Sequence, residues 1–432
     1  MRQGIGEAGV AADEQVFSRA AWRLIPFMGL LYVVSFLDRV NVGFAALTMN
    51  KDIGLDAQAY GFGAGIFFFG YFLFELPSNV ILERVGARLW IFRIMLTWGL
   101  ISMATAFVTG PTSFYVVRFL LGLAEAGFFP GMVLYLTYWF PASMRARFIA
   151  MFLAAVPLSS VMGGPVSGYI LSLDHIAGLE SWQWLFLLEG LPSCLLALAV
   201  LLVLPDRPAK AKWLSDEEKA QIVTRLAADP PADHHTLLPM LKDMRVWLLA
   251  IPDFGIVLGL YAVNLWLPQI VKGMGFSNLQ TGFVVAVPYM VSAIAMVAWG
   301  YSSDRHDERL GHVALAALVA GAAFFATAWF KSDLVSLVAL TVASAGVYAA
   351  LSVFWTLPPS FLGGTAAAGG IALINSISNL GGFFGPMLMG TLLQKTGSHA
   401  AGMAALGAVQ MAVVLVLLLL GRSGMLSPAA RR

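Results

Sequence analysis

The 432-residue sequence has little charge: Asp, Glu, Lys and Arg together make up 12% of it, against roughly 25% in soluble domains. It has one cysteine, Cys194, so neither a disulfide framework nor a cysteine metal site can be built from it. The six histidines are scattered or lie in predicted loops. There is no polar tract or basic stripe, which excludes a disordered chain and a nucleic-acid-binding protein. The sequence predicts no soluble enzyme, no metal centre and no cofactor.

Apolar residues dominate instead. Hydrophobic residues make up 59% of the chain and the mean hydropathy is +0.80, which is more apolar surface than a soluble protein can hide. Because a helix needs about 20 apolar residues to cross a bilayer, the long apolar stretches predict an all-α membrane protein with twelve transmembrane helices. The expected spans are 24–48, 59–82, 90–109, 113–139, 148–172, 183–204, 246–270, 280–301, 311–330, 334–361, 366–392 and 400–421.

A polar segment with five prolines divides these spans into two sets of six. Within it, Ser215 and Glu218 form a capping box, in which each side chain satisfies a free backbone amide at a helix start. A short surface helix through about Ala227 is expected to follow, as a solvated linker without chemistry. The predicted units are a cytoplasmic tail at 1–21, a six-helix bundle at 22–204, the linker at 205–243, a second six-helix bundle at 244–421 and a tail at 422–432.

The distribution of Lys and Arg predicts the orientation of the chain. If the N-terminus is inside, the inside segments carry 20 of these residues, whereas the outside loops carry only Lys51, Lys272, Lys331 and Lys395. Positive charge accumulates on the cytoplasmic side of membrane proteins. We therefore expect both termini and the linker in the cytoplasm, with the protein in a bacterial inner membrane.

An internal repeat relates the two halves at an offset of 221 residues. The pattern Glu83-Arg84-x3-Arg88 recurs as Asp304-Arg305-x3-Arg309, and Gly164-Pro165 recurs as Gly385-Pro386. Two parallel repeats predict two similar bundles, related by a pseudo-two-fold axis along the membrane normal, that can rock about a site at their interface. The Gly-Pro pairs are expected to bend helices and permit close packing.

These features resemble the major facilitator superfamily over essentially the whole chain. Its loop motif, Gly-x3-Asp-Arg-x-Gly-x-Arg, matches residues 79–88, with Asn79 in place of the glycine and Glu83 in place of the aspartate, and recurs in part at 300–305. The resemblance implies two rocking bundles. The charged residues of the motif are expected either to bridge the bundles as a cytoplasmic gate or to serve only as topology anchors. They are Glu83, Arg84, Arg88, Asp304 and Arg305.

Further motifs resemble the anion:cation symporter family of organic-anion transporters within that superfamily. They lie at residues 36–41 (Phe-Leu-Asp-Arg-Val-Asn), 71–77, 118–131 and 375–382. Together they are specific, whereas any one of them alone is weak. The stretch 354–379 is most similar to bacterial tartrate-type and related carboxylate permeases.

Ionisable groups at membrane depth usually mark a pathway, because each costs at least roughly 2.5–3.5 kcal/mol there. All those deep within the predicted spans belong to the first half. We therefore expect the first half to handle charge and protons and the second half to shape the substrate. Glu189 and Asp253, close to span ends, are expected to be structural. The five deep residues are Asp38, Arg39, Glu75, Arg118 and Glu125.

Arg39 is the residue expected to hold the substrate carboxylate. A guanidinium stays charged when desolvated and meets a carboxylate with two parallel hydrogen bonds, and the family resemblance implies the same role. A permanent ion pair with Asp38 or Glu125 is the alternative. Arg118 shares a helix face with Gly122 and Glu125, so it is expected either to pair with Glu125 or to contact the substrate.

Asp38 and Glu125 are the expected proton-coupling groups. Burial disfavours a charged carboxyl and a nearby arginine favours it, so the arrival of substrate at Arg39 can change the protonation of either acid. Two static salt bridges are the alternative. Asp38 and Arg39 point about 100° apart on their helix, so each can have its own partner.

Other residues of the spans are expected to gate or contact the substrate. Glu75 precedes Pro77, which favours a helix-bend or gate role over proton transfer. Tyr71, one turn away on the same face, is expected to contact the substrate.

The second half contributes neutral groups. Asn375 and Asn379, one turn apart, can hydrogen-bond the substrate or join helices. Trp355 is expected to contact the substrate, although it and Tyr261 can equally serve packing.

The predicted function is import of a small organic carboxylate together with protons, by a monomeric secondary transporter that interacts with the lipid bilayer. A proton-driven efflux antiporter of amphipathic compounds is the main alternative, although such a pump would favour an acid-lined apolar pocket over a fixed cation such as Arg39. No nucleophile, metal or P-loop pattern supports an enzyme or a primary pump. Tartrate-like hydroxy-dicarboxylates, sugar acids and aromatic carboxylates all fit, and sodium coupling stays open.

Overall fold

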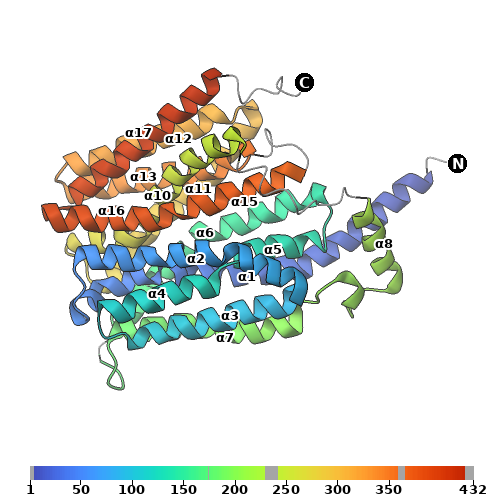
Figure 1. Cartoon of the computed structure of the whole chain (residues 1–432), viewed down its shortest axis with the longest axis horizontal. Coiled ribbons are helices and arrows are strands. Elements are labelled where there is room, and N and C mark those ends of the chain that lie inside the picture. The colour runs from blue at the N-terminus through green and yellow to red at the C-terminus, as the bar shows by residue number, and fades with distance from the viewer. Residues whose placement is uncertain (1–3, 174, 229–241, 359–364, 424–432) are drawn as a thin grey trace.

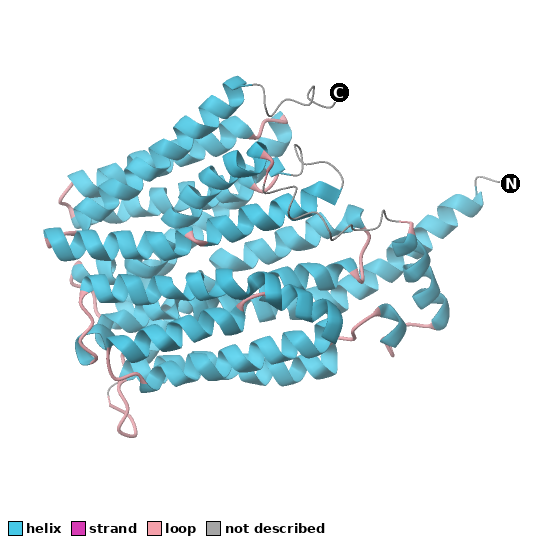
Figure 2. Cartoon of the chain, viewed as in Figure 1, coloured by secondary structure: helices cyan, strands magenta, loops and turns pink. Residues whose placement is uncertain are grey.

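The computed structural model describes residues 4–173, 175–228, 242–358 and 365–423. Within these ranges the chain consists of helices joined by loops (Figure 1 and Figure 2), with one isolated β-bridge between Ile176 and Leu179. Helices suit so apolar a chain, because each segment then satisfies its own backbone N–H and C=O groups, as lipid demands. The last residues of the expected span 334–361, and parts of the expected linker and tails, lie outside the described residues.

The helices follow one another in two sets, with the linker between them. The first set is α1 (Gly4–Asp52), α2 (Ala57–Val85), α3 (Ala87–Ala104), η1 (Thr105–Phe107), α4 (Pro111–Glu125), α5 (Phe128–Thr137), α6 (Ala142–Ile170) and α7 (Ser181–Val203). The linker contains η2 (Pro208–Lys210) and α8 (Asp216–Ala227). The second set is α10 (Met244–Gly273), α11 (Asn278–His306), α12 (Leu310–Trp329), α13 (Asp333–Phe354), α15 (Thr365–Asn379), α16 (Gly381–Thr396) and α17 (His399–Ser423).

Each stretch expected to cross the membrane coincides with one of these helices or with a consecutive pair. Eleven segments of the described chain are long and apolar enough to cross a membrane, and α6, with 29 residues, lies where the fifth span is expected. The start of α1 and helix α8 lie at one end of the molecule, on the right in Figure 1. We call this the linker end, and the opposite end, where α1 connects to α2, the loop end.

The span expected at 113–139 is two helices, because the backbone turns at Gly127 with φ = +84°, a conformation that favours glycine. α4 therefore ends at Glu125. Gly122 in the same segment allows α2 to approach, since a β-carbon there would lie 2.0 Å from the carbonyl oxygen of Phe67. The two glycines thus place the Glu125 carboxylate at a helix end, beside α2.

The two halves pack together along two seams, α2 with α16 and α6 with α11. In both seams backbone lies against backbone. A β-carbon at Gly61 would lie 2.5 Å from the carbonyl oxygen of Pro386, and one at Gly164 would lie 2.6 Å from that of Gly282. Two of the predicted Gly-Pro residues, Gly164 and Pro386, therefore lie at close helix contacts between the halves.

The linker helix α8 begins at the predicted capping box: Ser215 Oγ accepts from the Glu218 N–H at 3.2 Å, and Glu218 Oε2 accepts from the Ser215 N–H at 2.9 Å. It is not simply solvated, however. Arg19 Nη1 on α1 lies 2.7 Å from Glu218 Oε1, and Trp213 stacks on Trp139 with ring centroids 5.6 Å apart. The linker is therefore docked on the first half.

Candidate functional site

Arg39, on α1, and Glu125, at the end of α4, form a buried ion pair. Arg39 Nη2 lies 2.5 Å from Glu125 Oε1, and the two side chains are 10% and 1% exposed. Ser35, one turn before Arg39, donates from its hydroxyl to the same carboxylate oxygen at 2.9 Å. Breaking such a pair by removing one partner is costly, because the other is left as an unpaired buried charge. Of the partners that the sequence left open for Arg39, the structure pairs it with Glu125.

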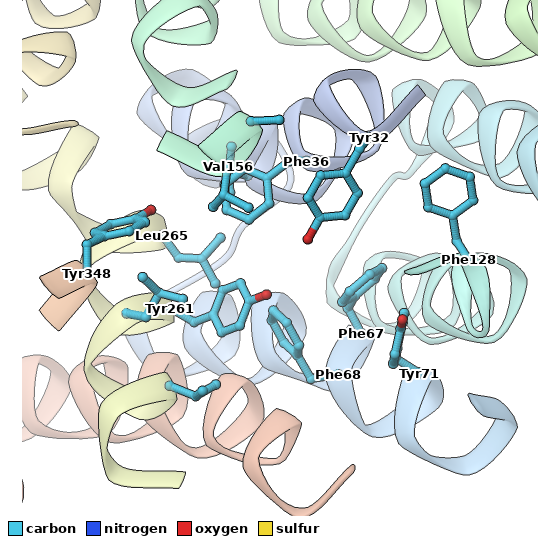
Figure 3. Packing of buried hydrophobic residues seen from close by; sticks show 14 of the residues in the cluster. Tyr32, Phe36, Phe67, Phe68, Tyr71, Phe128, Val156, Tyr261, Leu265 and Tyr348 are labelled. Atoms are coloured by element: carbon cyan, nitrogen blue, oxygen red, sulfur yellow. The ribbon is translucent and has the colours of Figure 1, made fainter. Parts of the chain in front are cut away.

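The other side of Arg39 faces the second half. Its Nη1 donates to the hydroxyl of Tyr261 on α10 at 3.1 Å. Its Cζ lies 5.2 Å from the ring centroid of Tyr71 and 5.5 Å from that of Phe67, both on α2, and aromatic faces attract cations. Figure 3 shows the hydroxyls of Tyr32 and Tyr261 pointing into the same central space. Arg39 thus joins the halves, lies beside Tyr71, and keeps Nε without a hydrogen-bond partner.

Asp38 is held apart from this pair, inside the first half. Its Oδ2 accepts from Trp98 Nε1 at 2.7 Å and from the Ser193 hydroxyl at 2.6 Å. Its Oδ1 accepts from the Ser102 hydroxyl at 2.9 Å. These donors belong to α3 and α7 and are all neutral, so a proton can reach Asp38 without breaking an ion pair. As expected from their positions on α1, Asp38 and Arg39 have different partners.

Glu75 on α2 makes a second contact between the halves. Its Oε1 accepts from Asn375 Nδ2 at 2.9 Å and its Oε2 from the Ser376 hydroxyl at 3.1 Å, both on α15. Asn379, at the end of α15, also lies against this carboxyl. The two predicted asparagines are therefore grouped around Glu75, on the linker-end side of Tyr71.

Arg118 on α4 is fully buried and poorly satisfied. Its Nη2 donates to the carbonyl oxygen of Ala64 at 3.4 Å, and its Nε and Nη1 have no hydrogen-bond partner. Its Cζ lies 5.0 Å from the ring centroid of Phe67, the same ring that Arg39 approaches. Within the described part of the chain no hydrogen bond joins Arg118 to Glu125. Arg118 therefore presents two unused donors in a buried setting, where an unpaired charge is costly.

The charged loop motif lies at the linker end. Arg88, at the start of α3, donates from Nη2 to the carbonyl oxygen of Leu201 and from its backbone N–H to Asp206 Oδ1, the latter at 3.1 Å. In the second half, Asp304 Oδ1 lies 2.5 Å from Arg309 Nη1. None of these contacts joins one bundle to the other, so the bridge between bundles remains a prediction. The other motif residues lie in the last turns of α2 and α11, namely Glu83, Arg84 and Arg305.

Trp355 follows the last residue of α13 and packs edge-on against Phe354, with ring centroids 5.7 Å apart. Among the side chains that the structure describes, no hydrogen bond or ring contact links Trp355 to Arg39. The part of α13 nearer the centre carries Tyr348, whose hydroxyl donates to Asn264 Oδ1 at 3.3 Å.

Sequence reasoning missed several partners of the charged groups. Ser35 and Phe67 had a usable signal, because each lies four residues before a predicted site residue and so shares its helix face. Ser376, a donor to Glu75, lies next to the predicted Asn375 in the motif at 375–382. The donors to Asp38 had no signal, since they come from distant segments; they are Trp98, Ser102 and Ser193.

No metal centre is built from this set. In the described ranges, no group of three or more His, Cys, Asp or Glu side chains is placed to hold a metal ion. The buried acids of the site are held singly, by neutral donors or by one arginine.

Comparison with known families settles the fold. The family model described as Major Facilitator Superfamily matches residues 28–386, which include all the site residues of both halves. The chain belongs to the Major Facilitator Superfamily. The family resemblance carried by the loop motif is thereby confirmed.

Relatives within the superfamily have two kinds of name. A protein of Agrobacterium vitis named "Putative tartrate transporter" is 47% identical over 423 residues, covering 96% of this chain and 94% of that protein. A "Quinolone resistance transporter" of Acinetobacter baumannii is 46% identical, covering 90% of this chain and 91% of that protein. The first name agrees with the resemblance to organic-anion permeases.

A solved superfamily structure has the same fold. The bacterial homologue of the human lysosomal transporter Spinster, in an inward-facing and occupied conformation, superposes with a TM-score of 0.76 at 17% identity, covering 92% of this chain and 96% of that one. At this identity the likeness shows the all-helical fold alone. With its membrane-length helices, the superfamily member is a multi-pass membrane protein, and its bacterial relatives are in keeping with a bacterial inner membrane.

Proposed function

We propose that this superfamily member is a secondary active transporter that imports a small organic carboxylate together with protons, by alternating access. It acts as a monomer with twelve membrane spans, the broken pairs α4–α5 and α15–α16 each counting as one. The bundles at 22–204 and 244–421 move about the site between them, joined by the linker at 205–243. The excess of Lys and Arg supports placing both termini and the linker end in the cytoplasm.

The observation that carries this proposal is the setting of Arg39. Its guanidinium holds Glu125 of its own half and Tyr261 of the other half, deep between the two. An incoming carboxylate can take the same guanidinium through two parallel hydrogen bonds, but it must displace Glu125. Because both anions compete for one cation, they fit together only when one of them is neutral.

Protonation of Glu125 removes this competition. The neutral acid no longer needs the guanidinium and keeps Ser35 as a hydrogen-bond partner, while Arg39 is released to the substrate. Proton and anion then enter as a pair, which is symport. Asp38, whose donors are neutral, is proposed as the second proton carrier, because its charge can change without disturbing Arg39.

The proposed substrate class rests on two guanidinium groups that lie against the same aromatic ring. Arg39 and Arg118 both approach Phe67, and Arg118 has two unused donors. A substrate with two carboxylates can engage both, which favours a tartrate-like hydroxy-dicarboxylate, in agreement with the name of the Agrobacterium relative. Tyr71 is proposed to contact this substrate near Arg39, and Trp355, Asn375 and Asn379 to complete its surroundings.

Glu75 is proposed as a gate at the linker end. Its bonds to Asn375 and Ser376 close α2 against α15, and the charged loop motif supports the same closure. The motif residues proposed for this role are Glu83, Arg84, Arg88, Asp304 and Arg305.

The test is uptake of labelled L-tartrate into proteoliposomes. An inward proton gradient should drive accumulation, and a protonophore should abolish it. Uptake that ignores pH and follows a sodium gradient would contradict proton symport. Failure of L-tartrate to bind or move, with uptake of a monocarboxylate instead, would contradict the two-arginine substrate class while leaving symport intact.

Efflux is the second candidate, favoured by the relative named "Quinolone resistance transporter". An antiporter moves its substrate against the proton flow and a symporter moves it with the flow. In vesicles with an acidic interior and an alkaline exterior, an antiporter would therefore accumulate an added quinolone, whereas the proposed symporter would accumulate neither the quinolone nor L-tartrate.

A further inference from the structure

A small buried cavity lies between the halves, on the loop-end side of Arg39. It offers about 10 Å³ to the centre of a water molecule, which is room for about one water. Its walls come from α1, α6, α10 and α11, and its polar lining includes Asn41, Ser160, Ser167 and Asn264. The cavity is therefore part of the contact that must separate when the loop end opens.

Polar atoms around this cavity lack partners. Asn41 Nδ2 and Oδ1, Ser160 Oγ and Asn264 Nδ2 have no hydrogen-bond partner, although these three side chains are 1%, 4% and 2% exposed. Buried polar groups are nearly always hydrogen-bonded. Donors and acceptors are both present, so a water molecule fits the cavity better than a bare cation, and it would connect α1 and α6 to α10.

A buried acid lies behind the cavity. Glu189 on α7 accepts through Oε1 from the Ser167 hydroxyl at 2.7 Å, and its Oε2 has no partner. Asn41 also lies against this carboxyl. Ser167 and Asn41 line the cavity on one side and contact Glu189 on the other, so a single layer of side chains separates Glu189 from the cavity.

The groups facing Glu189 do not neutralise it. The charged group that acts on it is another acid, Asp38 on α1. Among the other charged groups of the helices packed against α7, Arg39 on α1 is paired with Glu125, and Lys51 and Asp52 are exposed at the loop end of α1. Toward the linker end lie Arg88 and Arg93 on α3 and Arg145 on α6. A carboxylate buried without a cation and close to a second acid is strongly disfavoured, which argues for a neutral Glu189 while the cavity is covered.

We propose that Glu189 is a proton-binding site that fills from the loop end when the α6–α11 seam is open and is sealed when the seam closes. A proton carried in as hydronium adds to Oε2 and leaves a water molecule, while the Ser167 hydroxyl remains the donor to Oε1. In the opposite direction the proton returns to water. Ser193, one turn along α7, donates to Asp38, so both acids belong to one polar strip inside the first half. The opening and closing of the seam rests on the proposed function; the proton site itself does not.

The experiment is infrared difference spectroscopy of the purified full-length protein between acidic and alkaline buffer. Protonation of Glu189 gives a titrating C=O band of a carboxylic acid, which Glu189→Gln should remove. Glu180→Gln is the matched control, an exposed acid at the loop end of the same helix, and should leave the band in place. If Glu189→Gln does not fold, Ser167→Ala serves instead, since loss of the donor to Oε1 should shift the band without removing it. A spectrum unchanged by Glu189→Gln, or by Ser167→Ala, overturns the proposal.

A transport measurement gives the second arm. In proteoliposomes, Glu189→Gln should lose the response of L-tartrate uptake to external pH, whereas exchange of internal for external L-tartrate, which needs no net proton movement, should continue. Unchanged pH dependence would overturn a role for Glu189 in coupling. If no carboxylate is transported even by the wild type, the proposed function fails, and the infrared band still decides whether Glu189 binds a proton.

Discussion

The two halves share one architecture but differ in what they bury. The first half buries charged side chains on α1, α2, α4 and α7. In the described part of the second half a single acid, Asp253, is buried to the same degree, and the other buried polar side chains there are neutral, such as Asn264 and Gln410. The buried charged residues of the first half are Asp38, Arg39, Glu75, Arg118, Glu125 and Glu189.

In the proposed alternating access, this difference allows the halves to part. The contacts of the site that cross between them pair a charge with a neutral group: Arg39 with Tyr261, and Glu75 with Asn375. The ion pair of Arg39 with Glu125 lies inside the first half. Separation therefore breaks hydrogen bonds but no buried ion pair. Breaking a buried ion pair would cost about 3–5 kcal/mol. Substitutions of the charges should abolish function, and those of their neutral partners should only tune it.

The largest effect is expected at Arg39. Arg39→Ala should abolish L-tartrate binding, because no cation then replaces the guanidinium. Arg39→Lys should weaken it at least tenfold, because Lys lacks the planar fork; one charged hydrogen bond is worth about 1.5–3 kcal/mol, and about 1.4 kcal/mol is tenfold in affinity. The measurement is calorimetric affinity for L-tartrate and for its dimethyl ester, which should not distinguish wild type from Arg39→Lys.

Tyr261→Phe is the matched control for Arg39, since it removes only the neutral partner in the second half and should weaken binding by less than Arg39→Lys does. If Arg39→Lys binds L-tartrate as tightly as wild type, Arg39 is a structural ion-pair residue and the carboxylate must be held at Arg118.

The second effect concerns coupling. Glu125→Gln mimics a permanently protonated acid and frees Arg39, so proton-driven accumulation of L-tartrate should be lost while exchange continues. Asp38→Asn keeps its three donors within reach and should likewise lose accumulation. The measurement compares accumulation with exchange in the same proteoliposomes. Full accumulation by both variants would show that the proton uses another acid.

A third effect is expected at Gly282, in the seam between α6 and α11. A β-carbon at Gly282 would lie 2.3 Å from the carbonyl oxygen of Gly164, so Gly282→Val should force the α6–α11 seam apart and shift the population toward a form open at the loop end. Spin labels at Lys51→Cys and Gly273→Cys, in a Cys194→Ser background, should then report longer distances.

The matched control for the seam is Gly300→Val in the same helix, because nothing lies within 4 Å of a β-carbon added there. Equal distance distributions for the Gly282 and Gly300 variants would show that the seam does not control opening.

The smallest effect is expected at Asn375. Asn375→Ala removes one neutral donor from Glu75 and leaves Ser376 in place, so the rate of L-tartrate uptake should change by about tenfold or less, with its affinity kept. Complete loss of L-tartrate binding would instead place Asn375 in direct contact with the substrate.

The sequence predicted the helices well and the partners of the buried charges poorly. Long apolar runs mark spans because lipid acts on every residue of a segment, and helix geometry correctly separated Asp38 from Arg39. Whether Arg39 faces Glu125 or Asp38 depends on how α4 packs against α1, which no local pattern encodes. The break at Gly127 was not predicted, since it ends one helix and starts another inside a single apolar run. Glu189 was expected to be structural because of its position near a span end, whereas the structure places it behind a cavity between the halves.

The docking of α8 on the first half has a consequence for how the protein is made. Arg19 holds Glu218 of α8, and Trp139 holds Trp213 of the linker just before α8. All four residues are synthesised before residue 228. At about 5–20 residues per second, the ribosome needs roughly 10–40 s more to reach residue 432. During that time the first half already has its own cover at the linker end and its own counter-ion for Arg39. It can therefore settle in the membrane as a complete unit, and the second half then assembles against a finished surface.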